Sequence, residues 1–114
     1  MRPWAAKNAS ALERFFAAYI EGCRATQDPS QRDLTLKMLS RELKLNERIA
    51  KLTHKELNTA GSGMSRDCAF DRQGFGNVLA LRAEMEGQWG GKPPEPEQFL
   101  ELSFNARALR SIQP

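Results

Sequence analysis

The stretch that decides the fold is residues 12–23, LERFFAAYIEGC. Its apolar side chains recur at intervals of three and four residues, which places them along one side of an α-helix. They are Leu12, Phe15, Phe16, Tyr19, Ile20 and Cys23. Charged side chains such as Glu13 and Glu21 fall outside this stripe. The pattern predicts a first helix from about Pro3 to Thr26, with Pro3 in the first turn, where a missing N–H is tolerated.

Composition extends this helical prediction to the whole chain. The 114 residues include one Val, three Ile and four Thr, against 27 Ala and Leu together. Sheets are enriched in β-branched residues, whereas Ala and Leu favour helices. We therefore predict one all-α segment over residues 1–114, with four main helices and a short C-terminal helix.

Capping residues place the remaining helices, because Asp, Asn and Ser accept hydrogen bonds from the first free N–H groups of a helix. With Asp28, Asn46, Asp71 and Ser103 as caps, we expect helices at about 29–43, 47–57, 72–85 and 104–112. In the second helix, the side chains expected to face inward are Leu34, Met38, Leu39 and Leu43. In the fourth helix, the side chains that share a face are Phe75, Val78, Leu79, Arg82 and Met85. Residues 87–96 contain three Gly and three Pro, so we predict a loop there.

Charge gives little indication of a partner. The net charge is +3, which is too mild to imply nucleic acid by itself. Residues 24–55 carry eight basic and four acidic residues and could form a DNA-binding helix-turn-helix. The turn at residues 44–46 lacks Gly, however, and the charges surround both helices, so we favour a solvated helix surface. No apolar run is long enough to cross a membrane, and the start of the chain lacks a signal-peptide pattern.

No set of residues predicts catalysis. Cys23 and Cys68 are interpreted as two isolated thiols, and Cys23 as a buried structural thiol rather than a nucleophile. His54 is the only histidine and has no predicted nucleophile or further metal ligand beside it. The segment 61–63 (Gly-Ser-Gly) lacks the strand and the terminal Lys of a phosphate loop, so it is read as a helix stop. We expect no enzyme, no cofactor and no metal site.

An ordered series of motifs resembles a known family. It consists of FGNVLALRAE at 75–84, GGKPP at 90–94 and LSF at 102–104, preceded by Trp4-Ala5, Asn8, Ala11-Leu12, Arg14-Phe15 and Ala18-Tyr19. Together they resemble the C-terminal third of the periplasmic substrate-binding proteins of ABC importers, in the nitrate/sulfonate/taurine branch that includes thiamine-precursor binders. Glu101-Leu102-Ser103-Phe104-Asn105 stands where that family commonly has an aromatic-rich "DLSYY" turn.

The resemblance implies two α/β lobes around a ligand cleft, of which this chain corresponds only to the last helices. It implies partners in the upstream lobes and the ABC permease, and a periplasmic location. The missing signal pattern instead leads us to expect the cytoplasm for the chain as it stands. Because the cleft would lie upstream, we expect no ligand binding by these residues alone. The alternative is a small cytosolic helical interaction module, either a homo-oligomer or a nucleic-acid binder.

Self-association is a further expectation, because the apolar side chains are numerous for so short a chain. The loop region bearing Trp89 and Phe99 has no obvious partner within 114 residues. Large exposed apolar patches usually mark an interface. We therefore predict a homodimer or higher oligomer, with Trp89 and Phe99 at or near the contact.

Overall fold

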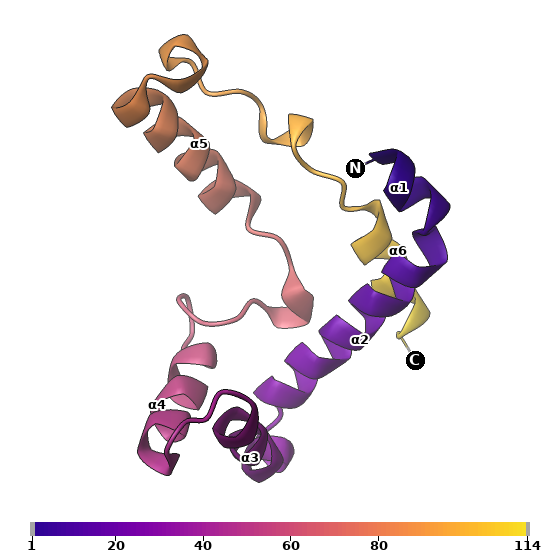
Figure 1. The fold of residues 1–114 in the computed structure, drawn as a ribbon, viewed down its shortest axis with the longest axis vertical. Helices are drawn as coiled ribbons and strands as arrows, with labels where there is room; N and C mark the ends of the chain where they lie inside the picture. The colour runs from indigo at the N-terminus through magenta and orange to yellow at the C-terminus, as the bar shows by residue number, and fades with distance from the viewer. Residues whose placement is uncertain (1, 114) are drawn as a thin grey trace.

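The computed structural model describes residues 2–113, and those residues are all-α, without a strand among them (Figure 1). The helices are α1 (Arg2–Lys7), α2 (Ala9–Gln27), α3 (Arg32–Glu42), α4 (Glu47–Leu57), α5 (Arg72–Glu86) and α6 (Ser103–Ser111). Four short 3-10 turns join them: η1 (Pro29–Gln31), η2 (Arg66–Cys68), η3 (Gln88–Gly91) and η4 (Pro96–Gln98). The predicted fold class is confirmed, with α2 to α5 as the main helices and α6 as the short last one.

The first helix differs from the prediction because it breaks at Asn8. Its backbone leaves the helical region, with φ −114° and ψ 23°. The Asn8 side-chain amide donates to the carbonyl oxygen of Trp4 at 2.9 Å. Short polar side chains that bond nearby backbone in this way compete with the helix. The single helix predicted from Pro3 to Thr26 is therefore wrong, and two helices, α1 and α2, stand in its place.

Three of the four predicted caps are confirmed. The side chains of Asp28, Asn46 and Asp71 accept backbone hydrogen bonds at 2.8, 3.0 and 2.8 Å, respectively. The cap predicted at Ser103 is wrong, since Ser103 already belongs to α6 and makes no side-chain cap bond. The Glu101 carboxylate accepts from the Ser103 N–H at 3.2 Å instead, which places a negative charge at the positive end of the helix.

The helices form an open arch rather than a compact bundle (Figure 1). α2 is the spine, and α6 lies along its N-terminal half. α3 and α4 pair at one end of the arch, while α5 packs mainly against η3 and η4 at the other end. The radius of gyration is 17.5 Å, against about 13 Å for a compact domain of this length.

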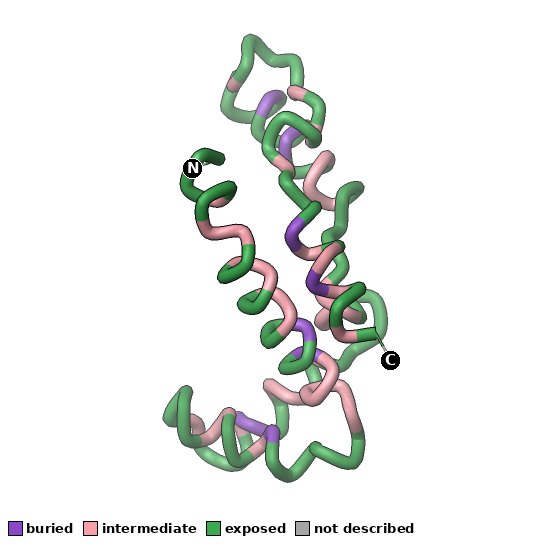
Figure 2. The backbone as a smooth tube through the Cα atoms, turned by 90° about the vertical axis from the view of Figure 1, so that its right-hand side faces the viewer, coloured by how far each residue is buried: buried purple, intermediate pink, exposed green. Residues whose placement is uncertain are grey.

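Little of the chain is buried, as Figure 2 shows by the few purple positions along the tube. The buried apolar residues are Ile20, Cys23, Ala50, Leu79, Ala83, Phe104 and Ala108. The accessible surface is 8702 Å², against about 6,300 Å² for a compact monomer of the same mass. Each part of the arch therefore has only a small core of its own.

The prediction that Leu34, Met38 and Leu43 face inward is wrong, because all three are exposed on or next to α3. The shared faces predicted for the first and fourth helices also include exposed members, which are Phe15 and Tyr19 on α2 and Val78, Arg82 and Met85 on α5. Ile20, Cys23 and Leu79 from the same faces are buried. The periodicity identified apolar faces correctly, but an apolar face is buried only where a second element packs on it.

The loop predicted at residues 87–96 contains no α-helix or strand, but it does contain η3. Trp89 has φ 54° and is followed by two glycines with φ of 68° and 77°. This left-handed run turns the chain back along α5, and glycine makes such a run inexpensive. Trp89 contacts Phe99, and Phe99 contacts Phe75, at ring-centroid distances of 6.3 and 6.1 Å. Trp89 and Phe99 nevertheless stay 43% and 53% exposed.

Candidate functional site

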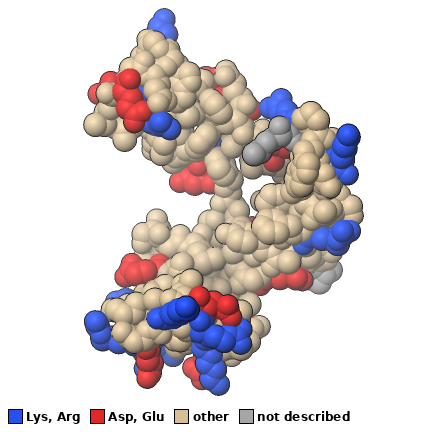
Figure 3. All heavy atoms as spheres, in the orientation of Figure 1, with Lys and Arg blue, Asp and Glu red and all other residues tan. Residues whose placement is uncertain are grey.

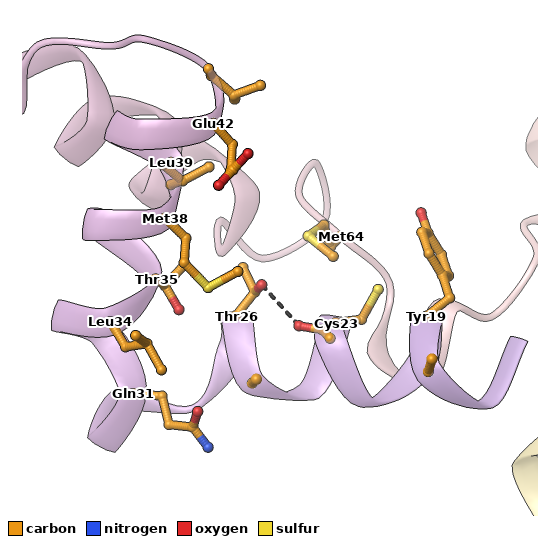
Figure 4. Close-up of a pocket in the computed structure, with 14 residues that line it drawn as sticks. Tyr19, Cys23, Thr26, Gln31, Leu34, Thr35, Met38, Leu39, Glu42 and Met64 are labelled. Atoms are coloured by element: carbon orange, nitrogen blue, oxygen red, sulfur yellow. Dashed lines mark hydrogen bonds between the residues drawn. The ribbon is translucent and has the colours of Figure 1, made fainter. Parts of the chain in front are cut away.

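An apolar groove of about 500 Å³ lies where α3 leaves the end of α2 (Figure 4). We call it the α2–α3 groove. Its lining comes from the C-terminal half of α2, from the end of η1, from α3 and the residue after it, and from the loop before η2. Those residues are Ala18, Tyr19, Gly22, Cys23, Ala25, Thr26, Gln31, Leu34, Thr35, Met38, Leu39, Glu42, Leu43 and Met64.

Local sequence explains the shape of the groove. The Asp28 cap and Pro29 end α2 and start η1, so α3 runs crosswise to α2 (Figure 4). Apart from Tyr19, the residues of α2 that line the groove are small, and a Cβ on Gly22 would meet no atom within 4 Å. Met38 and other long side chains of α3 form one wall, and Met64 lies across from them. Small residues facing long ones leave the groove open.

Chemically, the groove is suited to an apolar surface rather than to a polar ligand. Glu42 is its only charged lining residue. The Thr26 hydroxyl is already used, since it donates to the carbonyl oxygen of Gly22 at 2.9 Å (dashed in Figure 4). Small-molecule sites normally hold several polar groups that converge on the ligand. The groove therefore has the character of a protein-contact surface.

The prediction that Cys23 and Cys68 are isolated thiols is wrong, because they form a disulfide between α2 and η2. Their Cα atoms lie 6.7 Å apart although 45 residues separate them in sequence. Cys23 is buried, as predicted, but as half of a cross-link. No sequence signal indicates this pairing, since the spacing of two cysteines does not report whether a fold brings them together.

Polar contacts beside the disulfide fix the same loop to α2. Arg24 Nε donates to the Asp67 carboxylate at 2.5 Å. One turn further along α2, the Gln27 side-chain amide donates to the carbonyl oxygen of Met64 at 2.9 Å. Asp67 and Cys68 both have positive φ, 55° and 54°, which non-glycine residues adopt only at a cost. The disulfide and these bonds together hold the loop in that conformation, and with it one wall of the α2–α3 groove.

The Arg24–Asp67 pair predicts a dependence of stability on pH. The hydrogen bond from Arg24 is the main reason that the pKa of Asp67 lies below its ordinary value. The folded state thus binds the Asp67 proton less tightly than the unfolded state does. The stabilisation is complete above the ordinary Asp pKa of about 3.9 and is lost as the pH falls through the lower folded-state value.

We expect Asp67→Asn to reduce the free energy of unfolding at neutral pH and to have less effect as the pH approaches 2. Urea unfolding of both proteins over that pH range measures the difference. A constant difference between the two proteins at every pH would contradict the assignment of this pair.

The remaining sequence candidates do not converge on a site. His54 lies on α4, where its Nε2 atom and the side-chain amide nitrogen of Asn58 are 3.5 Å apart. Among residues 2–113, no group of three or more His, Cys, Asp or Glu side chains could hold a metal ion. In the 61–63 segment, a Cβ on Gly63 would lie 2.5 Å from the carbonyl oxygen of Leu57. That segment therefore covers the negative end of α4, which repels a phosphate. Within the same residues, no helix is both long and apolar enough to span a membrane.

The eight basic residues at 24–55, which we call the basic band, lie mainly on α3 and α4, and acidic side chains are interspersed among them (Figure 3). Lys51 pairs with Glu47 at 2.5 Å, and Arg41 pairs with Glu42 at 2.6 Å. A hollow of about 520 Å³ lined by Arg32, Arg48, Lys51 and Lys55 is the most basic part. The arrangement favours the solvated-surface interpretation over a recognition helix that presents one basic face.

Comparison with known proteins gives no relative, since no family model, curated protein or solved structure matches the chain.

Proposed function

We propose that this chain is the C-terminal helical part of an ABC-importer solute-binding protein of the nitrate/sulfonate/taurine type. In that role, α2 to α5 cover and complete an α/β lobe, and the ligand cleft is formed by other residues. The chain by itself then binds no transported solute. The proposal names a structural part of a transport protein and not an enzyme.

The observation that carries this proposal is the open arch with apolar faces that no part of the arch covers. The chain exposes about 2,400 Å² more than a compact monomer of its mass would. Exposed apolar side chains occur on α2, α3 and α5 alike. A layer of helices that packs on a sheet has one apolar face of this kind. The ordered motif series at residues 4–19 and 75–104 gives independent support.

The disulfide supports the same role. Disulfides form and persist in oxidising compartments such as the bacterial periplasm and are rare in the cytosol. The Cys23–Cys68 bond therefore favours an exported protein over the cytosolic module. We accordingly propose a periplasmic location.

Split-protein complementation tests the proposal. The two lobes of a binding protein of this type, lacking their own last helices, are expressed alone and together with residues 1–114. We expect the chain to restore soluble lobes that bind their solute, measured by calorimetry. Met38→Glu in the α2–α3 groove should abolish the rescue, whereas the exposed Lys37→Glu on the same helix should preserve it. Lobes that remain insoluble with the wild-type chain would contradict the proposal.

For the chain alone, we expect no saturable heat of binding with nitrate, taurine, an alkanesulfonate or a pyrimidine thiamine precursor. The reason is that the lining of the α2–α3 groove is mainly apolar and has one charged residue, whereas sites for such ligands need several converging polar groups. A stoichiometric, saturable titration with any of the four would show that these helices contain a site of their own.

A second candidate function is a small interaction module that associates with itself. The specific observation in its favour is that Trp89 and Phe99 contact each other yet remain about half exposed. Tryptophan and phenylalanine contribute strongly to protein interfaces when a partner covers them. We do not extend this candidate to nucleic acid, because acidic residues pair with the basic band.

A further inference from the structure

The two ends of the arch carry opposite net charge. We propose that this chain forms a dimer in which each end of one copy binds the oppositely charged end of the other copy. We define the α3–α4 arm as residues 32–57 and the α5 arm as residues 71–101. In the proposed twofold dimer, the α3–α4 arm of each copy packs against the α5 arm of the other. This inference rests on the second candidate function and gives its geometry. It is an alternative to the first, because it covers with a second copy the apolar faces that the first proposal places against a lobe.

The charges of the two arms are complementary. The α3–α4 arm has seven basic and four acidic residues, a net charge of +3 with His54 neutral. The α5 arm has three basic and six acidic residues, a net charge of −3. The two arms lie at opposite ends of one arch (Figures 1 and 3), so they do not neutralise each other within a copy. Complementary charge of this kind steers association and selects its orientation.

Both arms also present apolar side chains that the arch leaves uncovered. On the α3–α4 arm these include Leu34, Met38 and Leu43, which line the α2–α3 groove. On the α5 arm they include Val78, Leu81 and Met85. Trp89 and Phe99, which follow α5 in the same arm, are also exposed, and Phe99 contacts Phe75 in the first turn of the helix. Apolar centres with a charged surround are typical of protein interfaces.

The surface available is sufficient for a stable dimer. The chain exposes 8702 Å², about 2,400 Å² more than a compact monomer. A standard interface covers about 800 Å² on each partner. Two reciprocal arm contacts can therefore reach that size within the excess surface. A twofold axis makes both contacts identical and leaves no free arm, so the assembly closes at two copies.

Charge reversal on one arm tests the pairing without touching the apolar core. Lys37 and Arg48 are exposed on the α3–α4 arm, and Glu84 and Glu95 are exposed on the α5 arm. In variant A (Lys37→Glu, Arg48→Glu), the net charge of the α3–α4 arm becomes −1 and that of the α5 arm stays −3. In variant B (Glu84→Lys, Glu95→Lys), the net charge of the α3–α4 arm stays +3 and that of the α5 arm becomes +1. Each variant then has arms of like charge, so we expect each to dimerise at least tenfold more weakly than wild type.

Mixing the two variants supplies the matched control. In a heterodimer of A and B, every arm contact again joins opposite charges. Native mass spectrometry of the mixture should show the heterodimer in excess over both homodimers, and light scattering should show recovery of the dimer mass. Helical dichroism of A and B alone shows whether each variant is folded.

Three outcomes would overturn the inference. One is a monomeric wild-type chain at micromolar concentration with its disulfide intact. Another is a dimer that both variants form as tightly as wild type does. The third is a mixture of A and B without preference for the heterodimer. None of these outcomes bears on the complementation assay, so the two proposals fail separately.

Discussion

Loss of the Cys23–Cys68 disulfide is expected to lower the free energy of unfolding by about 4 kcal/mol, because the bond closes a long loop in the unfolded chain. The sequence separation is 45 residues, and the chain-entropy estimate grows with the logarithm of that length. The effect is a large fraction of the total stability of a small domain. Reduction should therefore leave the chain only marginally folded.

Urea unfolding of the oxidised chain, the chain treated with dithiothreitol, and the double variant Cys23→Ser, Cys68→Ser measures this effect. We expect the treated chain and the double variant to unfold at similar, much lower urea concentrations. Dithiothreitol should not change the double variant, which controls for effects of the reagent. Equal midpoints for the oxidised and reduced chain would mean that the other contacts hold the loop to α2 without the bond.

Ile20→Ala is expected to lower the free energy of unfolding by about 3 kcal/mol, as large-to-small substitutions at buried positions do. Ile20 is 0% exposed and is the one large side chain among residues 2–113 that is fully buried. It lies on α2, the spine of the arch, so the cavity would weaken the centre of the structure. Urea unfolding at a concentration at which the chain is monomeric isolates this effect from association.

Phe15→Ala is the matched control on the same helix. Phe15 belongs to the same predicted stripe as Ile20 but is 62% exposed. Exposed substitutions usually change stability by no more than about 0.5 kcal/mol. Equal losses for Ile20→Ala and Phe15→Ala would mean that both side chains are covered, and that the helices pack differently from the arch.

Few contacts join the parts of the arch to one another. The α5 arm connects to the rest of the arch through the loop held by the disulfide and through the segment before α6. The ion pair of Arg107 with Glu13, at 2.5 Å, fixes α6 on α2 at the other end of that path. Cross-links are most valuable where the core is too small to hold an element by itself.

The sequence by itself determined the local structure. The shortage of β-branched residues excluded a sheet among the described residues, and the caps at Asp28, Asn46 and Asp71 located the starts of η1, α4 and α5. These features depend on neighbouring residues, whose spacing is visible in the sequence. Asn8 was missed because an Asn side chain breaks a helix only when it bonds the preceding turn, and periodicity does not report that bond.

Only the tertiary structure decided which apolar faces are covered and which residues meet. Phe15 and Ile20 lie in one stripe of one helix, yet one is exposed and the other buried, because α2 is covered along part of its surface only. Cys23 and Cys68 meet because the loop after α4 returns to α2, and the α2–α3 groove exists because α3 crosses the end of α2. Whether a side chain is buried or meets a given partner depends on elements far apart in sequence. The residue pattern within one helix therefore cannot predict it.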